Sequence, residues 1–118
     1  MRVSHSVPPS KLIDDLMKDR SVAEATIRIT SKAGTKCIID LRGSYHAYIP
    51  LGCCGKGYAR SSTWVQHNDC HMPQVACVGY SSQTGTLFLL DADLRIIDQI
   101  SDIKSVIVES TTKATTPT

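Results

Sequence analysis

The chain has 118 residues, 42% of them hydrophobic and 20% charged, which is the size and composition of one globular domain. Its net charge is +2, and 13 basic residues are dispersed among 11 acidic ones, so the sequence predicts no binding to nucleic acid. No apolar stretch reaches the ~20 residues of a membrane helix, and no signal-peptide pattern begins the chain, so we expect a cytoplasmic protein that does not bind membranes.

One helix is predicted near the N-terminus. Apolar side chains recur at helical spacing from Leu12 to Met17. Ser10 follows two prolines, which together form a helix-start signal in which the serine can serve as the N-cap. We therefore place the helix at about residues 10–20.

The segments that follow the helix are expected to be β-strands. Ile27 and Ile29 alternate with polar residues, which is the period of a half-buried strand, whereas residues 86–90 form a continuous apolar run typical of a strand buried on both faces. The predicted strands are residues 25–31, 37–41, 74–80, 86–90, 94–97 and 105–108.

Together these elements predict an α+β fold that is mostly β. One N-terminal helix would pack on a five- to six-stranded sheet, antiparallel or mixed, or on a small partly open barrel. The single domain is expected to span residues 10–109, after a flexible lead of residues 1–9 and before a disordered tail of residues 110–118.

Residues 42–73 show little periodicity and hold three of the four histidines, so we expect an irregular segment that carries the function. Within it, His67, Asp69 and His71 would point the same way in an extended chain. Two histidines and one carboxylate suit iron(II) or zinc with open coordination positions. The alternative is a polar loop whose side chains form local hydrogen bonds.

The cysteines do not form a recognisable framework. Their number is five, which argues for reduced thiols, and Cys37 and Cys77 lie in apolar runs typical of a core. Cys53, Cys54 and Cys70 lack the C-x2-C spacing of zinc knuckles.

Two further groups of residues on this segment have the composition of possible binding sites. The glycine-rich residues 52–57 lack the spacing of a phosphate loop and predict a tight turn. Arg42 and His46 could bind a small anionic substrate at the end of the second strand, or could simply be solvated.

Several short motifs occur in an order that resembles a known family. Residues 25–35, ATIRITSKAGT, follow a helix; Trp64 precedes His71-Met72-Pro73; and a strand then leads to residues 85–87, GTL. Over about residues 12–97 this order is similar to that of the metal-dependent family containing 2,5-dihydroxypyridine dioxygenase and the aminopeptidase T group. The resemblance implies that His71 is a metal ligand. Residues 81–83, Ser-Ser-Gln, replace the glutamate usual before the G-T-L strand.

Two functions follow as hypotheses. The first is a small metal-dependent enzyme, either an oxygenase or a hydrolase, that acts on a small polar or heteroaromatic molecule. Its catalytic residues would be His71 and His67; its iron(II) or zinc ligands His67, Asp69 and His71; and its substrate-binding residues Trp64, Tyr45, Arg42 and His46.

The second hypothesis is a non-catalytic module that has lost the metal site. It would bind a small ligand or assemble with copies of itself. Residues 87–90 and 103–108 carry few charges and would allow edge pairing between subunits. In both hypotheses we expect a small-molecule ligand and a homo-oligomer.

Overall fold

The computed structural model describes residues 8–113, without the side chains of residues 44–46, 53, 110, 112 and 113. The elements in this part of the chain are α1 (Pro9–Lys18), β1 (Val22–Ser31), β2 (Lys36–Pro50), the 3-10 helix η1 (Gly52–Cys54), β3 (Lys56–His67), β4 (Cys70–His71), β5 (Cys77–Ser81), β6 (Thr86–Leu90), β7 (Ile96–Ile100) and β8 (Ile103–Lys113). None of the helices in residues 8–113 has the length and apolar character needed to span a membrane.

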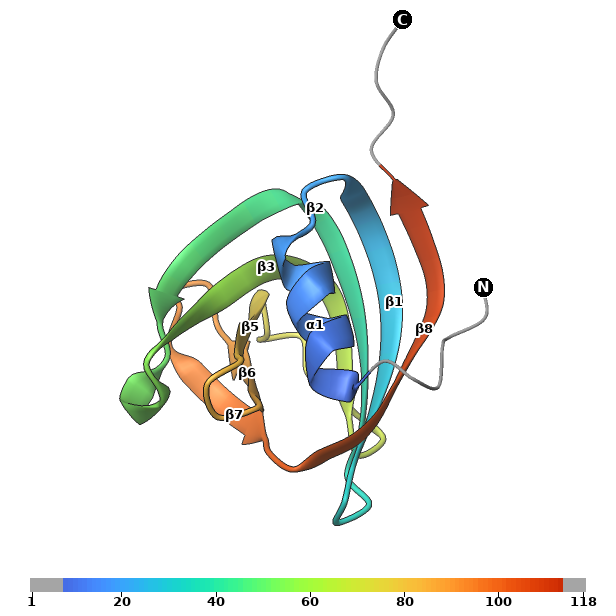
Figure 1. The fold of residues 1–118 in the computed structure, drawn as a ribbon, viewed down its shortest axis with the longest axis vertical. Helices are drawn as coiled ribbons and strands as arrows, with labels where there is room; N and C mark the ends of the chain where they lie inside the picture. The colour runs from blue at the N-terminus through green and yellow to red at the C-terminus, as the bar shows by residue number, and fades with distance from the viewer. Residues whose placement is uncertain (1–7, 114–118) are drawn as a thin grey trace, which may run out of the picture.

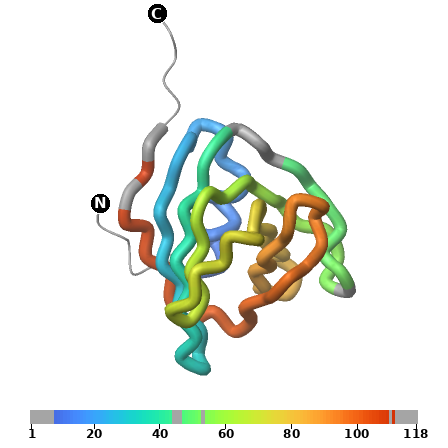
Figure 2. Tube along the Cα trace, turned by 180° about the vertical axis from the view of Figure 1, so that it is seen from behind, coloured from blue at the N-terminus to red at the C-terminus, as the bar shows by residue number. Residues whose placement is uncertain are grey.

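The strands form one antiparallel sheet in the order β7-β6-β5-β3-β2-β1-β8, and β4 pairs with β3. This sheet curves around α1, which lies against its inner face (Figure 1). From behind, β1, β2 and β3 run side by side along most of their length (Figure 2). The prediction of one N-terminal helix on an antiparallel sheet is confirmed, but the described sheet has eight strands instead of the predicted five or six. The barrel alternative is wrong, because β7 and β8 remain as two edges of the described sheet.

Apolar side chains on the inner face of the sheet form the main core with one side of α1. Ile13 and Met17 of the helix pack against alternate residues of the strands, including Ile27, Ile39 and Val65. This alternation is the period-two pattern that the sequence displays in β1 and in the first part of β2. As predicted, every residue of β6 is buried, since a second cluster covers its other face.

The expectation of an irregular segment over residues 42–73 is wrong, because two long paired strands occupy most of it. The inner positions of β3 include Arg60 and Ser62 as well as apolar residues, so the apolar alternation is lost. Gly43, with φ of 87°, lies where the β2–β3 register shifts, and its left-handed backbone suits glycine.

The ends of the elements also differ from expectation. Pro8, not Ser10, is the N-cap of α1, and no side chain caps it; the Ser10 hydroxyl instead accepts a hydrogen bond from the Tyr80 hydroxyl at 2.7 Å. β8 continues to Lys113, four residues past the predicted end of the domain. The predicted lead and tail otherwise fall on residues 1–7 and 114–118, outside the described residues.

The two segments predicted to allow edge pairing lie in different places. Residues 87–90 belong to β6, whose backbone is paired on both sides with β5 and β7, so that half of the expectation is wrong. Residues 103–108 belong to β8, which is an edge. The β8 ladder with β1 is regular only over residues 105–108, between two register shifts.

Candidate functional site

The turn between β3 and β4 separates the predicted metal ligands. Asn68 and Asp69 form a two-residue hairpin loop with φ of 51° and 64°, which is the type I′ geometry. The ladder pairs His67 with Cys70 and Gln66 with His71. Directly opposed residues share a face, so His67 and His71 project from opposite faces of the hairpin. The expectation that they point the same way is wrong, because the chain reverses between them.

His67 lies on the inner face, in the row of Cys37. Its side chain is only 13% exposed, and its Nδ1 atom lies 2.9 Å from Oδ2 of Asp98 on β7. Its Nε2 atom is buried and has no hydrogen-bond partner among the described residues. The surroundings of His67 are therefore those of a packed residue at the end of β3.

His71 lies on the outer face, stacked on Trp64. The two ring centroids are 5.5 Å apart and the planes are inclined by 20°. Asp69 is at the exposed turn, where its Oδ1 atom accepts a hydrogen bond from Gln66 Nε2 at 3.5 Å. Among the side chains that the structure describes, no three histidines, cysteines, aspartates or glutamates are grouped as metal ligands. His67, Asp69 and His71 thus do not fit one iron(II) or zinc ion in this arrangement.

A row of side chains crosses the outer face over five neighbouring strands. Its members, directly opposed in the ladders, are Ile107 of β8, Arg28 of β1, Ile38 of β2, Gln66 of β3 and His71 of β4. A groove of about 330 Å³ is lined by the first four of these residues, and also by Thr30, Lys36 and Asp69, but not by His71. Its lining combines aliphatic, amide, cationic and carboxylate groups.

A second groove, of about 200 Å³, lies further along β1 and β2 on the same face. Asp40 lines it and is directly opposite Trp64, while Gln66, two residues beyond Trp64 on β3, lines the first groove. The Trp64–His71 stack therefore lies beside the two grooves, on β3 and β4. We call the two grooves and this stack the outer binding face.

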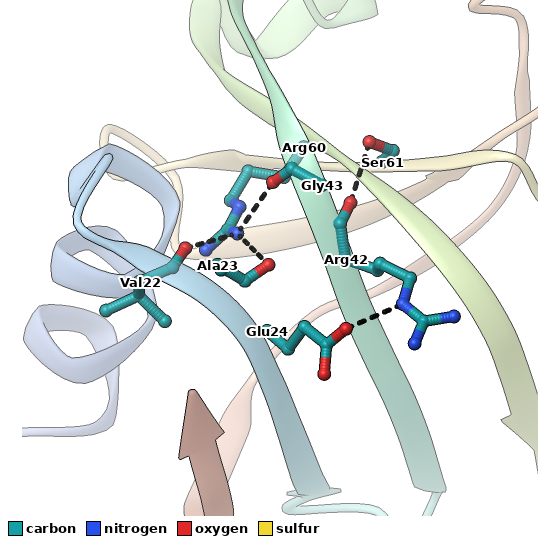
Figure 3. A network of polar contacts seen from close by, with 7 residues as sticks. All are labelled: Val22, Ala23, Glu24, Arg42, Gly43, Arg60 and Ser61. Atoms are coloured by element: carbon teal, nitrogen blue, oxygen red, sulfur yellow. Dashed lines mark hydrogen bonds and ion pairs between the residues drawn. The ribbon is translucent and has the colours of Figure 1, made fainter. Parts of the chain in front are cut away.

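Ion pairs neutralise most of the cations on the outer binding face. Arg42 Nε donates to Oε1 of Glu24 at 2.8 Å, from the neighbouring strand (Figure 3). Arg28 is paired in the same way with Glu109 of β8. The third cation, Lys36, shares the face with the carboxylates of Asp40 and Asp69. The face is thus balanced in charge and has no basic patch among its described side chains.

The structure brings together part of the predicted site. Arg42, Trp64, Asp69 and His71 all belong to the outer binding face, and His67 does not. Tyr45 and His46 lie in β2, but their side chains are outside the described part. Sequence reasoning missed Arg28, Lys36 and Gln66, which only the strand register places beside the others.

Arg60 is a further residue that sequence reasoning missed, and its role is structural. Its side chain is fully buried, and its guanidinium donates to the carbonyl oxygens of Leu16 at 3.0 Å and Val22 at 2.8 Å. Longer contacts reach the carbonyls of Ala23 and Gly43 (Figure 3). Burial lowers the pKa of Arg60, but arginine stays protonated in proteins. Arg60 thereby joins the end of α1 to β1 and β2.

The positions of the two cysteines predicted to lie in the core are confirmed. Cys37 and Cys77 are buried, as predicted, and burial raises the pKa of Cys37 to about 12 and that of Cys77 to about 11. Such thiols stay protonated and are poor nucleophiles. Residues 52–54 form η1, with β3 starting at Lys56, which confirms the tight turn. Cys70 is exposed.

Comparison of the chain with protein-family models, curated proteins and solved structures gave no match. The resemblance to the dioxygenase and aminopeptidase T family therefore stays a prediction.

Proposed function

We propose that this chain is a non-catalytic module that binds a small polar ligand on its outer binding face. The observation that carries the proposal is the Trp64–His71 stack, which stands on a sheet face beside two grooves. An aromatic pair in such a place does not belong to the core, since Trp64 is only half-buried and His71 is exposed.

The size and lining of the larger groove support ligand binding. Small-molecule sites are usually concavities of about 300–1,000 Å³ with a few polar groups among apolar ones. The groove of about 330 Å³ is at the lower end of that range, and Ile38 and Ile107 alternate in it with Arg28 and Gln66. Ile107 is 51% exposed, so a ligand lying against it would remove apolar surface from water.

The metal-dependent enzyme has less support from these residues. That hypothesis needs His67, Asp69 and His71 around one centre, whereas His67 is turned inward toward Asp98. General acid–base catalysis requires the imidazole of His71 to reach a proton of the substrate. The contact described for His71 is the stack on Trp64, which orients an imidazole without activating it.

Tryptophan fluorescence tests the proposal directly, because Trp64 is the single tryptophan of the chain. A panel of neutral sugars, amino acids and pyridine carboxylates would be titrated while fluorescence and backbone amide NMR shifts are recorded. We expect at least one class to change the emission and to shift amides of β1–β4 selectively. Gln66→Ala should weaken that binding about fivefold or more, as loss of one hydrogen bond does. Gln99→Ala, on exposed β7, is the matched control.

Two outcomes would overturn the proposal. One is that no member of the panel shifts amides of the outer binding face. The other is stoichiometric binding of iron(II) or zinc that is lost in both His67→Ala and His71→Ala, since it would show that the two imidazoles converge.

A further inference from the structure

We infer that the ligand of the outer binding face is a neutral, extended polyhydroxylated chain, that is, an oligosaccharide. This inference rests on the proposed function and narrows it to one class. Three features of the face support it: its balance of charge, the arrangement of its two grooves, and the flat aromatic pair beside them.

The charge balance disfavours an anionic ligand. Arg42 and Arg28 are committed to Glu24 and Glu109, so an anion would have to compete with carboxylates already in place. Like charges brought near the ligand would cost binding energy, and Asp40 and Asp69 are both on the face. A neutral ligand has no such penalty, and it can accept hydrogen bonds from Lys36.

The polar groups that remain suit hydroxyl groups. Hydroxyls both donate and accept, and the face offers acceptors in the Asp40 and Asp69 carboxylates and both functions in Gln66. Thr26 and Thr30 add hydroxyls on alternate outward positions of β1. A ligand that carries many hydroxyls in a row matches this mixture better than an apolar molecule does.

The two grooves indicate a ligand longer than one ring. The first groove centres on Ile38 and the second reaches Arg42, four residues along β2, which corresponds to about 13 Å of strand. Trp64 lies beside them, opposite Asp40 of the second groove. An indole ring has a flat apolar surface with a negative π-face, against which the C–H groups of a sugar ring pack well. A chain of sugar units that follows β1 and β2 through both grooves would pass Trp64 at its side.

Chain length and charge are therefore the variables to test. Neutral tetrasaccharides of glucose, galactose and mannose would be titrated against the full chain and compared with their monosaccharides. The same series would include an oligogalacturonate of equal length and pyridine-3-carboxylate. Trp64 emission and amide shifts of β1–β4 are the readouts.

We expect one of the neutral tetrasaccharides to shift amides of both grooves and to bind about tenfold or more tightly than its monosaccharide, because the second groove adds contacts to the first. Its affinity should change little between low and high salt, because salt screens only charge–charge attraction. Gln66→Ala and Thr26→Ala should each weaken it. They are preferred to Trp64→Ala, because removing a half-buried ring can also disturb folding.

The outcomes separate the two proposals. Tighter binding of the oligogalacturonate or of pyridine-3-carboxylate on the same amides, with steep salt dependence, would overturn the neutral oligosaccharide and leave the binding face standing. Failure of all three neutral tetrasaccharides, with another small polar molecule binding there, would do the same. No binding to these amides by any compound would overturn both.

Discussion

The Nδ1 atom of His67, at the end of β3, lies 2.9 Å from Oδ2 of Asp98 on the edge strand β7. In the described ladders β7 pairs only with β6, so this contact gives the edge strand a second attachment on another part of the sheet. The contact described for His71, four residues further along the chain, is the stack on Trp64, which joins no edge strand to another part of the sheet. In a metal site both histidines would be ligands, whereas here His67 contacts Asp98 on β7 and His71 stacks on Trp64.

Replacing these two histidines should therefore have unequal effects on stability. His67→Ala should lower the free energy of unfolding by about 1–3 kcal/mol, because it removes a partly shielded hydrogen bond and the packing of the ring. His71→Ala should change it by less than about 0.5 kcal/mol, because that side chain is exposed. Urea unfolding followed by circular dichroism measures both. Equal losses in the two variants would contradict the structural role of His67.

Replacing Asp69 by glycine tests whether this residue is only part of the hairpin turn or is a metal ligand. Asp69 has φ of 64°, a conformation that glycine adopts without strain, and Asn-Gly is the preferred type I′ pair. Asp69→Gly should raise the free energy of unfolding by about 0.5–1 kcal/mol. A metal ligand replaced by glycine would instead lose metal affinity. Asp102→Gly, at φ of 52° in another turn, is a matched control for the backbone effect.

Arg60 should be among the least replaceable side chains. Arg60→Ala leaves the carbonyl oxygens of Leu16 and Val22 without their donor inside the protein, so we expect a loss of about 3–5 kcal/mol. Arg60→Lys keeps the charge but lacks the planar fork, and should still lose about half of that. Arg42→Ala, on the neighbouring strand and exposed, should cost about 1 kcal/mol or less. Thermal and urea unfolding of all three variants would check the order, and a mild Arg60→Ala would refute it.

The buried thiols predict a loss of stability in alkali. In the unfolded chain a cysteine loses its proton near its ordinary pKa of 9.0, whereas burial raises the pKa of Cys37 to about 12 and that of Cys77 to about 11. Between these pH values the folded protein binds more protons than the unfolded chain. The contribution of the buried thiols to the free energy of unfolding is therefore fully present below pH 9 and falls as pH rises. The slope for each thiol should be on the order of 1 kcal/mol per pH unit.

Unfolding free energies measured from neutral pH to pH 11 would show this slope. Cys37→Ala should start from a lower stability, because it leaves a cavity, but should decline less steeply. Cys70→Ala removes an exposed thiol and should leave the slope unchanged. An unaltered slope in Cys37→Ala would argue against the raised pKa.

The parts of the fold that could be predicted are those in which burial alternates with a simple period. The helix and the strands around Ile27, Ile39 and Leu89 expose one face or none, so their apolar residues recur regularly. The long arms of β2 and β3 could not be recognised, because Arg60 replaces an apolar residue on the inner face. From the sequence an arginine is expected to be exposed, because the sequence does not reveal that the carbonyl oxygens of Leu16 and Val22 accept its hydrogen bonds.

The candidate site was predicted in part for a related reason. Trp64, Arg42 and His71 are chemically conspicuous, and they do share a face. Their partners Lys36 and Gln66 are ordinary residues that matter only through the strand register, which a single sequence does not reveal. The separation of His67 from His71 depends on two left-handed residues between them, and that local reversal outweighs the alternation assumed for an extended chain.

The pairing of β1 with β8 has a consequence for folding during synthesis. Arg28 and Glu109 form an ion pair across 81 residues, and the whole β1–β8 ladder joins segments of similar separation. During translation β1 must wait for its outer neighbour until β8, about 80 residues further along the chain, has emerged from the ribosome. Contacts between residues so far apart in the sequence slow folding, and apolar surface stays exposed to solvent until they form. Loss of even the last dozen described residues would leave β1 as a bare edge and uncover part of the helix.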